Sequence, residues 1–179
     1  LGYAAVKGHV NTVKILLKDT RVDPNLADDK GCTPLHHTVK NSNWLRGHED
    51  EQIIEALLEN DRLNPNLQEK EHGYTALAWA VLKNNSSLFK RLLGDQRIEV
   101  NLPDNEGRTP FFLATTCTDT SNFSALLNHA SVEHHKPANN GKTAFDNMLD
   151  GPIGMSPRRG YVISMLKNAP VRQGIDPFL

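Results

Sequence analysis

Apolar residues recur along this chain as adjacent pairs that lie 41, 35, 34 and 39 residues apart. The pairs are Leu16-Leu17, Leu57-Leu58, Leu92-Leu93, Leu126-Leu127 and Met165-Leu166. Val13 precedes the first pair and Leu88 precedes the third by three or four residues, which is the spacing of one face of a helix. The pattern therefore predicts a series of short amphipathic helices that each carry one apolar pair.

Gly-x-Thr triplets lie between these pairs, with threonines 42, 34 and 34 residues apart. The triplets begin at Gly31, Gly73, Gly107 and Gly141. Threonine is a good helix N-cap, and Pro34 and Pro110 follow at the first helical position, where a missing N–H does no harm. We therefore expect a further short helix after each triplet, for instance over residues 34–40 and 76–83.

The spacings of the apolar pairs and of the Gly-x-Thr triplets both fit one 34-residue period, with insertions of seven, one and five residues. An extended stretch with turn-forming residues precedes each triplet, as in Val22-Asp23-Pro24-Asn25-Leu26, and predicts a hairpin or loop. Each unit is thus a loop, a helix, a turn and a second helix. Because two helices this short cannot bury their apolar side alone, neighbouring units must stack.

The second unit contains the sequence Asp28-Asp29-Lys30-Gly31-Cys32-Thr33-Pro34-Leu35-His36, and partial copies lie around Thr75, Thr109 and Thr143. Over residues 1 to about 168 the chain resembles the ankyrin repeat family. The resemblance implies an all-α ankyrin-repeat solenoid of about five helix-turn-helix units with hairpin loops. We expect repeats over 1–24 (truncated), 25–65, 66–100, 101–134 and 135–168, and a C-terminal tail over 169–179. The tetratricopeptide repeat, which shares the period, is disfavoured because its Trp-x-x-Leu-Gly pattern is absent.

Composition narrows the classes of partner. Twenty Lys and Arg against 21 Asp and Glu leave a net charge of −1, whereas nucleic acid and anionic lipid call for a basic excess. No apolar run is long enough to span a membrane, so we expect no membrane partner. Two cysteines, Cys32 and Cys117, cannot form a disulfide framework, which favours an intracellular location, cytoplasmic or nuclear. The hydrophobic content of 38% fits a stack with a thin core.

Catalytic and metal motifs are absent from the sequence, so we expect no enzyme activity, no cofactor and no metal. His9 and His36 occupy signature positions at which the family uses histidine for hydrogen bonds that tie the turns. Two adjacent pairs, His36-His37 and His134-His135, cannot easily share a metal on a helix because their side chains diverge.

In the family, the first helices and the hairpin tips line a concave face where most partners bind. Trp79 lies on a first helix, and its two readings are a partner contact or packing between neighbouring first helices. Trp44, inside the seven-residue insertion, either contacts a partner or folds back on its own repeat. The predicted partner-binding residues are Lys30, His37, Trp44, Glu71, His72, Tyr74, Trp79, Lys83, Glu106 and Arg108.

The sequence therefore predicts a non-catalytic scaffold or regulatory module that binds a protein partner or a neighbouring domain of its own chain, and we expect a monomer. The alternative is an ankyrin domain that regulates, or is attached to, an enzymatic domain of the same chain. The first unit lacks its hairpin and its Thr-Pro, so we expect a fragment of a longer protein. Two candidate modification sites are Ser156, which precedes Pro157-Arg158-Arg159, and Asn101, which is similar to loop asparagines hydroxylated in some ankyrin proteins.

Overall fold

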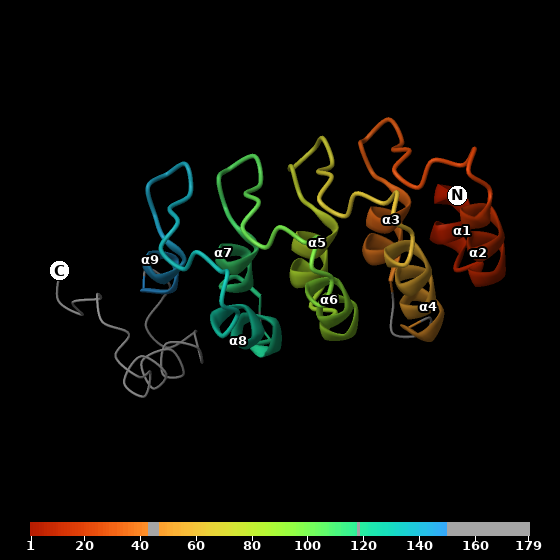
Figure 1. The fold of residues 1–179 in the computed structure, drawn as a ribbon. Helices are drawn as coiled ribbons and strands as arrows, with labels where there is room; N and C mark the ends of the chain where they lie inside the picture. Colours follow the sequence, from red (N-terminus) through yellow and green to blue (C-terminus); the bar gives the residue numbers. More distant parts are fainter. Residues whose placement is uncertain (43–46, 118, 150–179) are drawn as a thin grey trace.

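The computed structural model describes residues 1–42, 47–117 and 119–149. In this part of the chain the secondary structure is helical, and the helices are arranged in pairs (Figure 1). The helices are α1 (Gly2–Lys7), α2 (Val10–Lys18), α3 (Pro34–Asn41), α4 (Gly47–Leu58), α5 (Ala76–Leu82), α6 (Ser86–Leu93), α7 (Pro110–Ala114), α8 (Ser121–Leu127) and α9 (Ala144–Leu149). The described residues thus hold four helix pairs and the first helix of a further unit, in agreement with the predicted all-α solenoid.

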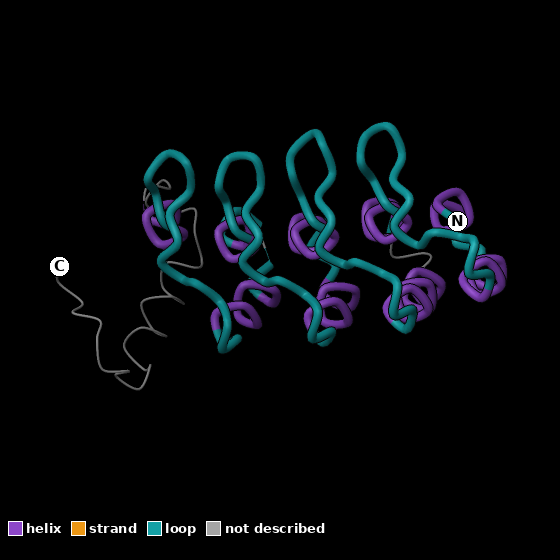
Figure 2. Tube along the Cα trace, turned by 45° about the horizontal axis from the view of Figure 1, so that its top comes forward, coloured by secondary structure: helices purple, strands orange, loops and turns teal. Residues whose placement is uncertain are grey.

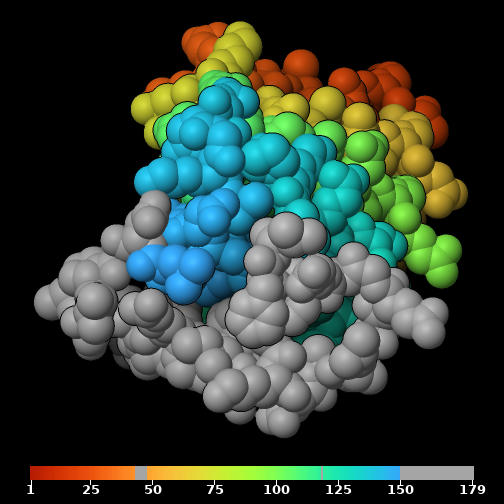
Figure 3. All heavy atoms as spheres, turned by 90° about the vertical axis from the view of Figure 1, so that its left-hand side faces the viewer, coloured from red at the N-terminus to blue at the C-terminus, as the bar shows by residue number. Residues whose placement is uncertain are grey.

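The helices form two rows along a single stack (Figure 2). The first helix of each unit packs against the first helix of the next, in the order α1, α3, α5, α7 and α9. The second helices α2, α4, α6 and α8 form the other row. Loops project beyond the row of first helices, and a view along the stack from α9 shows successive repeats one behind another (Figures 2 and 3). The hydrophobic core is therefore narrow and runs along the stack, because each level of the stack contains one repeat.

Threonine caps begin the first helices, as the triplets predict. Four threonine hydroxyl oxygens each accept the backbone N–H of the residue three positions further on, at 3.2–3.4 Å. These threonines are Thr33, Thr75, Thr109 and Thr143. Pro34 and Pro110 stand in the first turns of α3 and α7. Both α3 and α5 begin at the predicted residue and end within one residue of the prediction.

The apolar pairs supply the core of the second row of helices. Leu57, Leu92 and Leu126 are fully buried. One buried position in this row breaks the apolar pattern, because Asn122 occupies the place that Ile53 and Leu88 hold in the preceding units. Asn122 is 2% exposed, and among the described residues neither polar atom of its amide has a hydrogen-bond partner.

Asparagines in the loops tie neighbouring repeats together. The Nδ2 of Asn66 donates to the carbonyl oxygen of Arg97 at 2.7 Å, and its Oδ1 accepts the N–H of Glu99 at 2.9 Å. Asn25 and Asn101 make the same pair of bonds to the repeat that follows each of them. These asparagines therefore join one repeat to the next.

Candidate functional site

The loops before the first helices are hairpins that bond to one another in a row. In the third hairpin, the Asp104 N–H donates to the Arg108 carbonyl and the Gly107 N–H donates to the Asp104 carbonyl, both at 2.9 Å. Backbone bonds of 2.8–2.9 Å join neighbouring hairpins, from Lys70 N to Lys30 O, from Asn105 N to His72 O and from Asn139 N to Glu106 O. The hairpins and the first helices together form one surface, which we call the inner surface.

A carboxylate near the start of the first and third hairpins closes each loop. Asp28 accepts the N–H groups of the residues two and four positions further on, at 3.0 and 2.8 Å, and Asp104 does the same at 2.9 and 2.8 Å. Burial raises the pKa of Asp28, but the N–H of Cys32 and the nearby His37 outweigh that effect, so the net pKa lies below its ordinary value. The fourth hairpin has Ala138 at this position and lacks this side-chain closure.

The second hairpin is one residue longer and uses a glutamate in this role. Glu69 accepts the N–H groups of Glu71, His72 and Tyr74 at 2.8, 3.0 and 3.3 Å. Its additional methylene reaches across the additional residue of the loop. Burial raises the pKa of the Glu69 carboxyl, and these N–H donors lower it by more, so that it stays ionised although the residue is 2% exposed.

An aromatic cluster of His72, Tyr74 and Trp79 lies where the second hairpin meets α5. The rings of His72 and Tyr74 are stacked, with centroids 5.0 Å apart and planes at 4°. Trp79 meets Tyr74 edge to face, with centroids 5.2 Å apart and planes at 85°. Tyr74 is buried, whereas His72 and Trp79 are half-buried. The cluster thus fixes the hairpin to the helix and leaves two of its rings partly open at the inner surface.

Two cations extend the aromatic cluster into the neighbouring repeats. On the side of α3, the Nζ of Lys40 lies 4.5 Å from the centre of the Trp79 ring. On the side of the third hairpin, a terminal nitrogen of Arg108 donates to the hydroxyl of Tyr74 at 3.0 Å. Arg108 also pairs with Asp104 at 2.8 Å and with Glu106 at 3.0 Å. One connected array of side chains therefore crosses three repeats.

The charge states of this array are set by burial and by its ion pairs. Burial raises the pKa of the Tyr74 phenol, which stays neutral. Burial lowers the pKa of Arg108, but Asp104 raises it by more, so the guanidinium stays charged. Burial also raises the pKa of the Cys32 thiol beside Lys40, so Cys32 is not poised as a thiolate nucleophile. The Tyr74 phenol, the Arg108 guanidinium and the Cys32 thiol therefore keep their ordinary protonation states near neutral pH.

Of the predicted partner-binding residues, the structure brings five into this array: His72, Tyr74, Trp79, Glu106 and Arg108. The others in the described chain lie apart from it. His37 pairs with Asp28 at 3.0 Å, while Lys30, Glu71 and Lys83 are exposed. Trp44 and Ser156 fall outside the described residues.

Tyr74 is buried, so it is not an exposed anchor for a partner in this structure. Tyr74 is 8% exposed, because its ring lies between His72 and Trp79 and its hydroxyl is bound by Arg108. Trp79 is half-buried and packs against Tyr74 and against Lys40 of the neighbouring first helix, whereas its contact with a partner stays a prediction. Tyr74 therefore holds the other side chains of the array in position and contributes little exposed surface itself.

Lys40 and Cys32 belong to the array and were not among the predicted residues. The Nζ of Lys40 lies 3.4 Å from the Sγ of Cys32. A signal was present in the sequence, since Lys40 follows His37 by three residues and so lies on the same face of the first helix. The register between repeats, which places Lys40 over Trp79, was not visible in the sequence.

The two signature histidines differ in the structure. His36 is 1% exposed, and its ring bonds to Thr33 on one side and to the carbonyl oxygen of Tyr74 on the other. The structural role predicted for His36 is confirmed. His9 is exposed and makes no side-chain capping bond at the start of α2, so the same prediction is wrong for His9.

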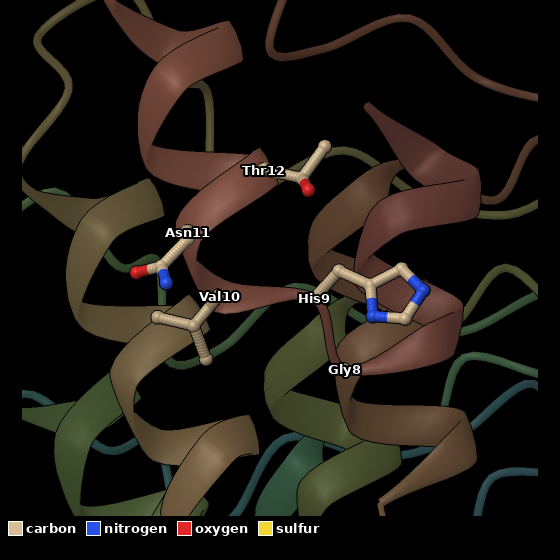
Figure 4. A pocket seen from close by; sticks show the side chains of 5 residues that line it. All are labelled: Gly8, His9, Val10, Asn11 and Thr12. Carbon is tan, nitrogen blue, oxygen red and sulfur yellow. The ribbon is translucent and has the colours of Figure 1, made fainter.

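Two other features of the described chain, a surface depression and a group of metal-ligand types, lack the arrangement of a site. An open depression of about 330 Å³ is lined by Gly8 to Thr12, and its His9 ring points away from Val10 and Asn11 (Figure 4). One turn supplies this whole lining, so no groups converge there from other repeats. Ligand atoms of Glu69, Glu71 and His72 lie within 4.8 Å of one another, but the Glu69 oxygens already accept three backbone N–H groups. Loop closure therefore accounts for the Glu69 carboxylate.

Comparison with known proteins agrees with this architecture. A family model described as ankyrin repeats, in three copies, matches residues 1–104. The chain is also similar to the Danio rerio protein named "Putative palmitoyltransferase ZDHHC13", with 32% identity over 114 residues. That match covers 64% of this chain and 16% of the relative. None of the helices in the described ranges is long and apolar enough to cross a membrane. With its signature sequence, its stacked helix pairs and its row of bonded hairpins, the chain belongs to the ankyrin repeat family.

Proposed function

We propose that this chain is a non-catalytic protein-interaction module that binds a protein partner through the inner surface around α3, α5 and the first three hairpins. Ankyrin repeats are generally protein-interaction modules. The observation that carries the proposal is Trp79, a half-buried indole fixed by Tyr74 and Lys40 with part of its ring open to solvent. Tryptophan is enriched among the residues that dominate binding energy at protein interfaces.

The rigidity of the inner surface supports the same function. Each hairpin is closed by its own backbone bonds and joined to the next hairpin at 2.8–2.9 Å. Trp79 therefore has its surroundings in place before a partner arrives, and little conformational entropy is lost on association. In this proposal Trp79 and His72 contact the partner, while Tyr74 and Arg108 hold them in position.

The remaining predicted residues are polar. Glu106 is exposed within the array, Lys30, Glu71 and Lys83 are exposed outside it, and these side chains would contribute to specificity more than to affinity. His37 lies on the first helix α3 and is paired with Asp28 of the first hairpin. Trp44 stays a predicted contact.

Selection from a random peptide display library tests the proposal. Peptides selected on the wild-type chain should lose most of their binding to Trp79→Ala and keep it on Ile15→Ala. Ile15 is a matched control, because it is a large apolar side chain, 68% exposed, on the second helix α2. Circular dichroism should show equal helix content in the three proteins.

Two outcomes would count against the proposal. Selected peptides that depend on Ile15 and not on Trp79 would move the binding surface to the second helices. Selection that yields no peptide dependent on Trp79 would remove the assigned role of the inner surface. Tyr74→Phe serves as a second variant, since it deletes the hydroxyl that Arg108 binds and keeps the buried ring.

An array that regulates, or is attached to, an enzymatic domain of the same chain is the alternative function. The Danio rerio relative carries the name of a palmitoyltransferase, and the matched region is a small part of it. This is compatible with an ankyrin module attached to such a domain, and equally with an independent binding module. Here the partner of the inner surface would be a neighbouring domain, and Trp79→Ala would weaken that contact.

Several narrower predictions belong to this proposal. We expect a monomer that binds protein and not nucleic acid, in the cytoplasm or the nucleus. Phosphorylation at Ser156 and hydroxylation at Asn101 stay predictions. Both polar atoms of the Asn101 amide are already bonded to the next repeat, so hydroxylation at its Cβ would act next to an inter-repeat tie.

A further inference from the structure

Lys40 lies on a first helix and reaches from its own repeat to the next one. It lies in the last turn of α3, and its ammonium reaches the ring of Trp79 on α5 at 4.5 Å. Its hydrogen-bond partner is the Sγ of Cys32, at 3.4 Å. Sulfur is a weak acceptor, so this bond satisfies little of an ammonium group that has three donors.

Lys40 differs from the other half-buried cations of the described chain. Each of the others has a carboxylate as its ion-pair partner: Arg91 with Glu51 and Glu55, Arg97 with Asp95, Arg108 with Asp104 and Glu106, and Lys136 with Glu133. Among the residues with described positions, no carboxylate oxygen lies within 4.0 Å of the Lys40 ammonium. Among the described residues, its positive charge therefore meets an aromatic face and a thiol and is paired with no carboxylate.

Two hairpin carboxylates, Asp28 and Glu69, act on the Cys32 thiol that Lys40 contacts, and both are already bonded to other groups. Asp28 accepts two backbone N–H groups and pairs with His37. Glu69 accepts three backbone N–H groups and is 2% exposed. Neither carboxylate can turn to Lys40 without opening its own hairpin.

We infer that Lys40 and Trp79 together recognise an aspartate or glutamate side chain of the protein partner. This inference rests on the proposed function of the inner surface. The ammonium supplies the counter-charge, and the open part of the Trp79 ring supplies an apolar wall beside it. A charge at a half-buried position contributes chiefly to specificity, because a partner without the carboxylate leaves that charge unpaired.

A polyanion is a poor match for the same position. Lys40 is a single cation beside the Cys32 thiol, on which the Asp28 and Glu69 carboxylates also act, and Glu71 and Glu106 lie exposed on the neighbouring hairpins. A phosphate backbone would approach these carboxylates as well as Lys40 and would be repelled. A single carboxylate on a polypeptide meets the ammonium without that penalty.

Peptide pools with one fixed central residue and randomised flanks test this inference on the full chain. The peptides are capped at both ends to remove the terminal charges, so that the pools differ in charge only at the fixed residue. Binding of each pool is measured to the wild type, Lys40→Met, Lys40→Glu and Lys90→Met. The wild type should prefer pools fixed as Asp or Glu over those fixed as Asn or Gln by roughly ten-fold, as for one hydrogen bond to a charged group. Lys40→Met should lose this preference, and Lys40→Glu should prefer Lys or Arg.

Lys90 is the matched control, because it is an exposed lysine on the second helix α6. Lys90→Met should keep the wild-type preference, and circular dichroism should show equal folding for all variants. Equal binding of acidic and amide pools by the wild type, or an acidic preference that survives in Lys40→Met, would overturn the inference.

Trp79→Ala separates this inference from the function on which it rests. Pools that bind in a Trp79-dependent way without acidic preference would leave the proposed function standing and remove the role of Lys40. An absence of any Trp79-dependent pool would remove both. Better binding of a single-stranded oligonucleotide than of the acidic pools would assign the surface to nucleic acid and also overturn the inference.

Discussion

The imidazole of His36 joins two repeats, because its Nε2 donates to the carbonyl oxygen of Tyr74 at 3.0 Å. Its Nδ1 accepts the backbone N–H of Thr33 at 3.2 Å, so the ring proton resides on Nε2. The side chain is 1% exposed. A neutral imidazole thus satisfies one buried donor and one buried acceptor, and a second proton on the ring would leave the Thr33 N–H without its acceptor.

Stability should therefore depend on pH through His36. Burial lowers the pKa of this histidine in the folded chain, so below the ordinary value of about 6.5 the unfolded chain binds more protons than the folded chain. The free energy of unfolding should fall as the pH decreases from about 7.5 to about 5.5, a window above the ordinary carboxyl range. Urea unfolding at a series of pH values measures this slope.

His36→Gln provides the control, because it removes the titrating ring while the other histidines remain. The variant should be less stable than the wild type near pH 7.5, and its stability should change less with pH. Equal slopes in the two proteins would show that His36 does not titrate differently in the folded and unfolded states.

Two hairpin glycines offer a matched comparison of backbone strain and of contact with the next hairpin. Gly107 and Gly141 both have φ of +78°, a region that side chains other than glycine adopt at a cost of about 1–2 kcal/mol. A Cβ at Gly107 would lie 2.7 Å from the backbone nitrogen of Asn139, whereas a Cβ at Gly141 meets no described atom within 4 Å. At Gly107, therefore, both the backbone conformation and the closeness of the next hairpin favour glycine. At Gly141 the backbone conformation alone does so.

Gly141→Ala should lower the free energy of unfolding by about 1 kcal/mol, the cost of the left-handed backbone. Gly107→Ala should lower it by at least about 1 kcal/mol more, because the bonded hairpins must move apart. Urea unfolding of both variants measures the difference. Equal losses would mean that the row of hairpins yields to a methyl group without strain.

The sequence was sufficient to predict the helices and their caps because these depend on local signals. Thr33 and Thr75 accept N–H groups three residues away, and Pro34 fits the first turn whatever surrounds it. The 34-residue period then determines which helices stack. These features need no knowledge of side-chain contacts between repeats.

The array around Trp79 could be predicted only in part, because its contacts join residues far apart in the sequence. Lys40 and Trp79 are 39 residues apart, and Tyr74 and Arg108 are 34 apart. The period brings the right repeats together, but it does not fix the rotamers that put an ammonium over the indole or bury the tyrosine. Tyr74 was therefore predicted as an exposed contact, and Lys40 was not predicted at all.

Asn122 should be a weak point of the core, and its replacement should strengthen the fold. Neither polar atom of this buried amide is bonded within the part of the chain that the structure describes, and the two preceding units have Ile53 and Leu88 at the same position. An unsatisfied buried polar group costs about 1–3 kcal/mol. Asn122→Leu should therefore raise the free energy of unfolding by about that amount in urea titrations.

Asn128→Leu is the control at the end of the same helix, where the side chain is exposed, and it should bring no comparable gain. The reverse change, Leu88→Asn, should destabilise the chain by introducing the same defect into the preceding unit. A loss of stability in Asn122→Leu would mean that the space around α8 cannot take the larger side chain.

Loop length and side-chain length should be energetically coupled in the second hairpin. Glu69 closes a loop with one residue more than the loop that Asp104 closes, and it does so with one methylene more. Glu69→Asp alone should shorten the reach and weaken bonds between a carboxylate and backbone N–H groups, at a cost of about 1.5–3 kcal/mol. Deletion of Glu71 alone should also destabilise, because the longer side chain then faces the shorter loop.

The double variant should recover stability, since it recreates the loop geometry of Asp104. A double-mutant cycle measured by urea unfolding should give a favourable coupling energy of about 1 kcal/mol or more. Glu71→Ala, which keeps the loop length and removes an exposed side chain, should change little. If the two single changes add without coupling, the extra residue and the extra methylene are independent features of the hairpin. A favourable coupling would instead explain why the aspartate of the first and third hairpins is replaced by glutamate in the hairpin that carries His72 and Tyr74.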